Sequence, residues 1–170
     1  GRTILRPSAF GLTFRDEPAF GEHLRVTSVT RTRSAGTWKP VYGERDTVTD
    51  ACNQAVISLT ETRPPHRNVE MTFRACDEGM AFQYVVLPSE GRRESVLLEE
   101  HSRFVFAQDF PAWVVPTAQG RYERLTLSSA GADRERPLVV ELDAGLLVAI
   151  GEAKLVDFAR MKLSGVSGSA

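Results

Sequence analysis

The stretch NVEMTFRACDEGMAFQY, residues 68–84, decides the fold of this chain. Apolar and polar residues alternate from position 68 to position 75, which places Val69, Met71 and Phe73 on one face of an extended strand. The residues CDEG at positions 76–79 supply a turn, and Gly79 can adopt a positive φ there. We therefore predict a β-hairpin whose two strands meet at this turn.

The same alternation recurs outward from the hairpin, in short blocks separated by Gly, Pro, Asp and Ser. In residues 8–14, Phe10, Leu12 and Phe14 fall on one face. No long amphipathic helix pattern is present, and residues 154–158 fit a helical turn or a bend equally well. Many short strands without helices predict an all-β, antiparallel sandwich or barrel. The further predicted strands are residues 24–30, 51–60, 81–87, 103–107, 122–127, 138–142 and 146–150.

The length and charge of the chain narrow its class. A chain of 170 residues suits one domain, which we assign to residues 1–163, with a Ser/Gly-rich tail at residues 164–170. The 21 basic and 22 acidic residues nearly cancel, so no broad basic field is available for a nucleic acid. The apolar runs are far shorter than the roughly 20 residues that cross a bilayer. We therefore expect neither nucleic-acid binding nor a membrane span.

The residues alone do not predict a catalytic site. His23, His66 and His101 are the candidate bases, and none lies in a recognisable triad motif, so we expect all three on the surface or in loops. Glu99 and Glu100 are adjacent, and adjacent residues of a strand point to opposite faces, which makes them a poor pair for glycoside hydrolysis.

Two cysteines and two tryptophans each leave two interpretations open. Cys52 and Cys76 form no metal-binding motif, and we favour two small buried hydrophobes over a bridge between neighbouring strands. Trp38 and Trp113 are interpreted as core anchors, with sugar-stacking platforms as the alternative.

Glu152 has the most informative position among the carboxylates. It follows the apolar strand predicted at residues 146–150 and lies beside Gly151, which allows backbone or ligand to come close. A carboxylate at a strand end suits a calcium ion. One glutamate cannot complete a calcium site, nor can Glu152 with Asp157 be assigned as a glycosidase pair, so the residues alone favour a structural role.

Five segments, in chain order, resemble the N-terminal domain of glycoside hydrolase family 97. The segment FRACDEGMAFQY at residues 73–84 is similar to the family's fRaydDGvAfRy hairpin, and GEAKLVDFARMKL at residues 151–163 is similar to its hEAaLvdYp.M.L segment. The other three are RPSAFGLTF, TWKPVYGER and PAWVVP, at residues 6–14, 37–45 and 111–116. The sequence departs from the family where Cys52 and Cys76 replace aromatic residues, Gly151 replaces a His and Val114 replaces a second Trp.

The resemblance implies a supersandwich like that of galactose mutarotase, packed in the whole enzyme on a (β/α)8 barrel that holds the catalytic carboxylates. It implies an exported bacterial enzyme, periplasmic or secreted, that acts on an α-linked oligosaccharide, a glucoside or a galactoside, with calcium. Glu152 matches the family glutamate expected to reach that calcium, so we predict it as a metal ligand. The chain alone is expected to be inactive.

The resemblance also implies that the chain is truncated at both ends. We therefore expect the fragment to form a homodimer through exposed edges, or else to be only marginally stable, which sedimentation would test. A rival hypothesis is a free-standing carbohydrate-binding β-sandwich in which Trp38, Trp113 or Tyr122 contacts the sugar. A third is a pure interaction scaffold.

Overall fold

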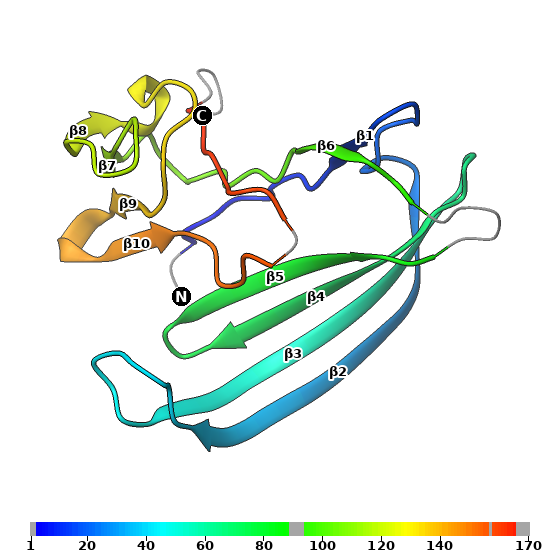
Figure 1. Cartoon of the computed structure of the whole chain (residues 1–170), viewed down its shortest axis with the longest axis horizontal. Helices are drawn as coiled ribbons and strands as arrows, with labels where there is room; N and C mark the ends of the chain where they lie inside the picture. The colour runs from blue at the N-terminus through cyan, green and yellow to red at the C-terminus, as the bar shows by residue number, and fades with distance from the viewer. Residues whose placement is uncertain (1–2, 89–93, 157, 166–170) are drawn as a thin grey trace. The chain divides into compact units, whose positions relative to one another are not determined.

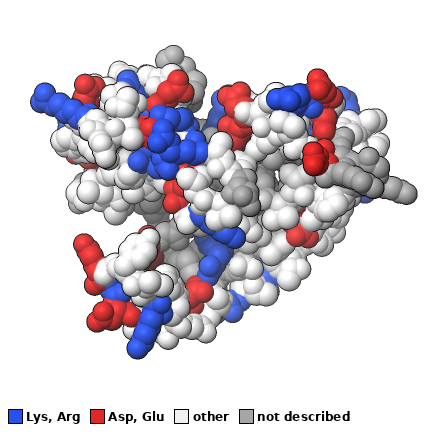
Figure 2. Space-filling view, in the orientation of Figure 1, with Lys and Arg blue, Asp and Glu red and all other residues white. Residues whose placement is uncertain are grey.

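The computed structural model describes residues 3–88, 94–156 and 158–165. Their regular elements are β-strands and two short 3-10 helices (Figure 1). The chain divides into two compact units, one of Ala9–Ser102 and one of Gly1–Ser8 with Arg103–Ala170. Among the described residues no helix is long and apolar enough to span a bilayer. On the face shown in Figure 2, acidic and basic side chains are interspersed.

The first unit is built on a four-stranded antiparallel sheet in the order β2-β3-β4-β5. A second, two-stranded sheet pairs β1 with β6. The strands are β1 (Leu12–Phe14), β2 (Leu24–Trp38), β3 (Val48–Glu61), β4 (Asn68–Cys76), β5 (Gly79–Val86) and β6 (Leu97–Glu100).

The predicted hairpin is confirmed, with one change in its turn. β4 and β5 pair from Val69 opposite Val86 to Cys76 opposite Gly79, and Asp77 and Glu78 form the turn. Gly79 already belongs to β5 and does not have a positive φ. The glycine therefore begins a strand instead of forming the turn.

The alternating apolar residues form the core of this unit, as predicted. Phe14, Val69 and Met71 are buried together, and Phe10 packs edge-on against the rings of Phe73 and Phe82. The remaining buried members of this cluster are Leu12, Phe20 and Leu59.

β2 and β3 are longer than the sequence pattern indicates. β2 continues beyond the predicted end at residue 30 to Trp38, paired with β3 as far as Val48. Nearly all of its side chains are exposed, so the apolar alternation that marks a half-buried strand is missing there. Backbone pairing with β3, not burial, maintains this part of the strand.

The second unit contains a four-stranded antiparallel sheet in the order β10-β9-β7-β8. Its buried core includes Ala112, Val114, Leu138 and Val140. β7 was not among the predicted strands, and residues 103–107, predicted as a strand, form only an isolated bridge between Phe106 and Leu5. The elements are β7 (Pro111–Val114), β8 (Glu123–Thr126), η1 (Leu127–Ser129), β9 (Leu138–Glu141), η2 (Asp143–Gly145) and β10 (Leu147–Ile150).

The two cysteines form a disulfide, so the favoured interpretation of two free thiols is wrong and the alternative is confirmed. Cys52 on β3 lies directly opposite Cys76 on β4. The pairing of these strands brings the two sulfur atoms within bonding reach, a register that the sequence alone did not specify.

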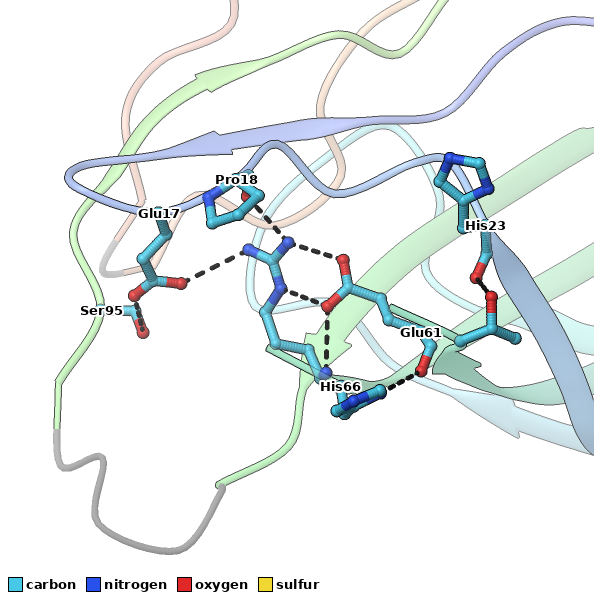
Figure 3. A network of polar contacts seen from close by, with 8 residues as sticks. Glu17, Pro18, His23, Glu61, His66 and Ser95 are labelled. Atoms are coloured by element: carbon cyan, nitrogen blue, oxygen red, sulfur yellow. Dashed lines mark hydrogen bonds and ion pairs between the residues drawn. The ribbon is translucent and has the colours of Figure 1, made fainter. Parts of the chain in front are cut away.

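A buried arginine ties the end of β3 to the turn after β1 (Figure 3). Arg67, 2% exposed, donates from Nε to Glu61 Oε2 at 2.8 Å and from Nη2 to Glu61 Oε1 at 2.6 Å. Nη2 also donates to the carbonyl oxygen of Pro18 at 2.8 Å. The guanidinium lies 5.0 Å from the centre of the Phe14 ring. A buried charge is tolerated here because it is paired and hydrogen-bonded.

We predict that removing the disulfide with Cys52→Ser and Cys76→Ser destabilises the domain. In the chain-entropy model, a crosslink across a sequence separation of 24 contributes about 3 kcal/mol, and prior pairing of β3 with β4 reduces this. Urea unfolding of the wild-type and double-variant domains measures the difference. Dithiothreitol should destabilise the wild type and leave the variant unchanged, whereas free thiols in the unreduced, denatured wild type would contradict the bond.

We predict that Glu61→Gln lowers the free energy of unfolding by about 3 kcal/mol, because it removes the nearer of the two carboxylates that pair with the buried Arg67 and leaves only Glu17 Oε2, 3.4 Å from Nη1. Burial raises the pKa of Glu61, but hydrogen bonds and positive charge from Arg67 lower it by more, so the net pKa is below the usual value.

Because the pKa of Glu61 is lower in the folded than in the unfolded chain, the pair stabilises the domain less as the pH falls. The contribution of Glu61 is complete above its unfolded pKa of about 4.3 and is lost as the pH falls through the folded pKa. Urea unfolding at a series of pH values should show a smaller acid-induced loss of stability in Glu61→Gln than in the wild type. Equal losses would show that this pair does not govern the acid response.

Candidate functional site

Glu152 follows β10 and its side chain lies in a cluster of charged groups. Its carboxylate oxygen Oε1 accepts a hydrogen bond from the backbone N–H of Met161 at 2.8 Å. The other oxygen, Oε2, forms an ion pair with Arg136 Nε. The side chain is 12% exposed, so it is neither free in solvent nor enclosed in the apolar core.

Glu135 is the second carboxylate of the cluster and contacts three cations. Its side chain is 4% exposed, with Oε1 2.5 Å from Lys162 Nζ and 2.9 Å from Arg160 Nη2. Oε2 lies 3.2 Å from Arg136 Nη1. The hydrogen bond from Lys162 lowers the pKa of Glu135, and the nearby positive charges lower it further against the opposing effect of burial. Glu135 is therefore an anion at neutral pH.

Backbone pairing brings these groups together. Arg134 and Leu163 exchange two hydrogen bonds, of 2.7 Å and 2.9 Å, in an isolated antiparallel bridge. The bridge aligns the segment that carries Arg160 and Lys162 with the segment that carries Glu135. Residues 164 and 165, assigned to a tail, continue this contact through Gly165 N–H and Gly131 O at 2.8 Å, and residues 166–170 lie outside the described residues.

Gly151 does not have the close contact expected for it. A side chain at this position would meet no other atom within 4 Å of its Cβ. The glycine is therefore not required by a close approach of backbone within this chain.

The cluster fits a metal ligand but not a complete metal site. Glu152 Oε2 is buried and accepts no hydrogen bond, although it lies against Arg136. A carboxylate oxygen with unused lone pairs is the donor type that calcium binds. No group of three or more His, Cys, Asp or Glu side chains that could hold a metal occurs among the described residues. Asp157, considered with Glu152 as a glycosidase pair, lies outside them.

The other candidate residues do not assemble into a catalytic site. His23, His66 and His101 are exposed, as predicted. Glu99 and Glu100 occupy successive positions of β6, where their side chains leave opposite faces of the strand.

The two tryptophans are surface residues, so their interpretation as core anchors is wrong. Trp38 is 54% exposed and Trp113 is 38% exposed, and Tyr122 is likewise exposed. The indole N–H of Trp113 donates to Glu141 Oε1 at 2.7 Å, and Arg124 binds the other oxygen of the same carboxylate. The side of Trp113 that could donate a hydrogen bond to a sugar is thus already occupied.

Solved structures of larger enzymes share the fold of this chain. A glycoside hydrolase family 97 enzyme from Pseudoalteromonas sp. strain K8, in complex with acarbose and in a variant complex with panose, matches 99% of the chain with a TM-score of 0.90 and 26% sequence identity. A β-arabinopyranosidase matches 99% with a TM-score of 0.87 and 17% identity, which shows a common fold. The chain spans 26% and 29% of the lengths of these two enzymes.

These matches confirm the predicted fold class, an antiparallel β-sandwich domain, here of a carbohydrate-active enzyme. The chain belongs to the glycosyl-hydrolase 97 N-terminal family, whose model matches residues 1–170. It therefore corresponds to the N-terminal domain of family 97 glycoside hydrolases, and the Pseudoalteromonas enzyme continues well beyond the part that the chain matches.

We predict that Glu135→Gln lowers the melting temperature of the domain more than Glu141→Gln does. Both carboxylates are paired with arginine, but Glu135 neutralises three cations and is 4% exposed, whereas Glu141 is 26% exposed and bound by Arg124 alone among cations. Differential scanning calorimetry at pH 7 measures both variants. Equal shifts would show that the cluster around Glu135 adds no more stability than a surface pair.

Proposed function

We propose that the chain is the non-catalytic N-terminal domain of an α-glycosidase, an α-glucosidase or an α-galactosidase. It packs on a (β/α)8 catalytic barrel and donates Glu152 to a calcium ion near the active site. The observation that carries the proposal is the position of the Glu152 carboxylate just after the last strand, where Oε2 is buried, ion-paired with Arg136 and makes no hydrogen bond.

Calcium chemistry supports this role for Glu152. A calcium ion takes 6–8 oxygen ligands, so a single carboxylate from this domain requires further ligands from the rest of the enzyme. When bound, the ion would supply positive charge to substrate oxygens or to the leaving group. Within this chain, the Glu152 carboxylate is fixed by the hydrogen bond that its Oε1 accepts from the N–H of Met161.

The substrate class is inferred from a relative. Panose and acarbose, found in structures of the Pseudoalteromonas enzyme, both contain α-linkages between sugar units. The β-arabinopyranosidase has the same fold, so the fold itself does not select the sugar. Two carboxylates of the catalytic domain would carry out hydrolysis, and their separation would decide whether the configuration is inverted or retained.

An exposed loop supports packing against another domain. The loop between β2 and β3 carries Val41, 99% exposed, and Tyr42, 90% exposed, close in sequence to the exposed Trp38. Large apolar side chains grouped on a surface are typical of interaction sites. This loop belongs to the segment at residues 37–45 that resembles the family motif.

The disulfide supports a periplasmic or secreted location. Bonds between cysteines persist in oxidising compartments and are rare in the cytosol. Cys52–Cys76 therefore favours an exported enzyme.

The exposure of Trp38, Trp113 and Tyr122 favours a second candidate, a carbohydrate-binding module. The two functions differ in what the isolated domain binds. Calorimetric titration with maltose and with melibiose should give no binding heat if the sugar site lies in the catalytic domain. Saturable binding that Trp38→Ala or Trp113→Ala abolishes would favour the second candidate.

We predict that Glu152→Gln weakens calcium binding by the full-length enzyme by more than about tenfold, because a neutral amide replaces a charged ligand. Isothermal titration of the metal-stripped enzyme with calcium chloride measures the affinity. Glu99→Gln, an exposed carboxylate on β6, is the control and should bind as the wild type does. An unchanged calcium affinity in Glu152→Gln would refute the proposed ligand.

A further inference from the structure

Arg136 lies between the two carboxylates of the cluster. Its Nε pairs with Glu152 Oε2 and its Nη1 lies 3.2 Å from Glu135 Oε2. The side chain is 23% exposed, against 12% for Glu152 and 4% for Glu135. A guanidinium can contact two carboxylates through separate nitrogens, which a single ammonium group cannot do in the same way.

Glu135 contacts Arg136 through a different nitrogen from the one that Glu152 contacts. Glu135 is kept anionic by Lys162, Arg160 and Arg136. Its negative charge, which Lys162 and Arg160 also contact, offsets part of the positive charge of Arg136. A calcium ion close to Glu152 would be repelled less by this guanidinium than by an unpaired one.

The contacts of Glu152 orient its carboxylate without using all its lone pairs. Oε1 accepts the N–H of Met161, whereas Oε2 is attracted to Arg136 but accepts no hydrogen bond. The side chain thus has a defined position, and Oε2 keeps lone pairs beyond its ion pair with Arg136. A carboxylate oriented in this way needs less reordering when a metal binds than a side chain free in solvent does.

We propose that Arg136 is a positioning residue for calcium binding, acting through Glu152. The inference rests on the proposed function of Glu152 as a ligand. Because Glu135 offsets the charge of Arg136, the gain from a fixed carboxylate exceeds the repulsion between guanidinium and metal. Loss of Arg136 therefore weakens calcium binding, whereas a guanidinium that merely competed with the metal would, when removed, strengthen it.

The experiment compares two arginines of the same cluster in the full-length enzyme. Arg136→Gln removes the contact with Glu152, whereas Arg160→Gln removes an equal charge beside Glu135 and does not touch Glu152. Isothermal titration of the metal-stripped proteins with calcium chloride should show a loss of about 10–100-fold for Arg136→Gln and little change for Arg160→Gln. Melting temperatures of the metal-free proteins report on folding separately from metal binding.

Arg136→Lys supplies a conservative variant. It keeps the charge but replaces the planar fork, whose separate nitrogens face the two carboxylates, with a single ammonium nitrogen, so its calcium affinity should lie between those of Arg136→Gln and the wild type. If Arg136→Gln does not fold, the calcium affinity of Arg136→Lys is the test of the inference. An affinity equal to that of the wild type overturns it.

The remaining outcomes separate the inference from the proposed function. Equal losses in Arg136→Gln and Arg160→Gln, or tighter binding in Arg136→Gln, overturn the positioning role. If Glu152→Gln weakens binding and Arg136→Gln does not, only this inference fails. If Glu152→Gln binds calcium as the wild type does, the proposed ligand fails and the inference fails with it.

Discussion

The candidate site depends on one backbone contact, the pair of hydrogen bonds that Arg134 and Leu163 exchange. The described residues after β10 form no regular strand, and this bridge pairs them with the segment that precedes β9. Only then do Arg160 and Lys162 reach Glu135, and the Met161 N–H reach Glu152. The electrostatics of the site are thus a consequence of backbone pairing between segments distant in sequence.

The alternation of apolar and polar residues predicted those strands that bury one face. The alternation that leads to Val69, Met71 and Phe73 identified the hairpin and its apolar face, because half-buried strands must alternate. The exposed end of β2 and the short strand β7 gave no such signal. Cross-strand register, which sets Cys52 opposite Cys76, is a property of the paired sheet and had no local signature.

In the candidate site, too, the sequence predicted some residues and not others. Glu152 could be singled out because it follows an apolar strand and matches a family segment. Its partner Arg136 and the buried Glu135 belong to no motif, since their roles come from contacts across the chain. Arg67 and Glu61 were missed for the same reason, although they form the most deeply buried ion pair among the described residues. Sequence reasoning thus located the proposed ligand but not the residues that contact it.

The edge strand β2 has a consequence for association between copies of the domain. Its outer side presents backbone groups that a second strand could pair with. The strand also carries Arg25, Arg31 and Arg33, all exposed. Two such strands brought together would place guanidinium groups of like charge near one another, an energetic penalty that discourages growth of the sheet from one molecule into the next. The arginines thereby disfavour aggregation through the edge of β2, a strand of 15 residues.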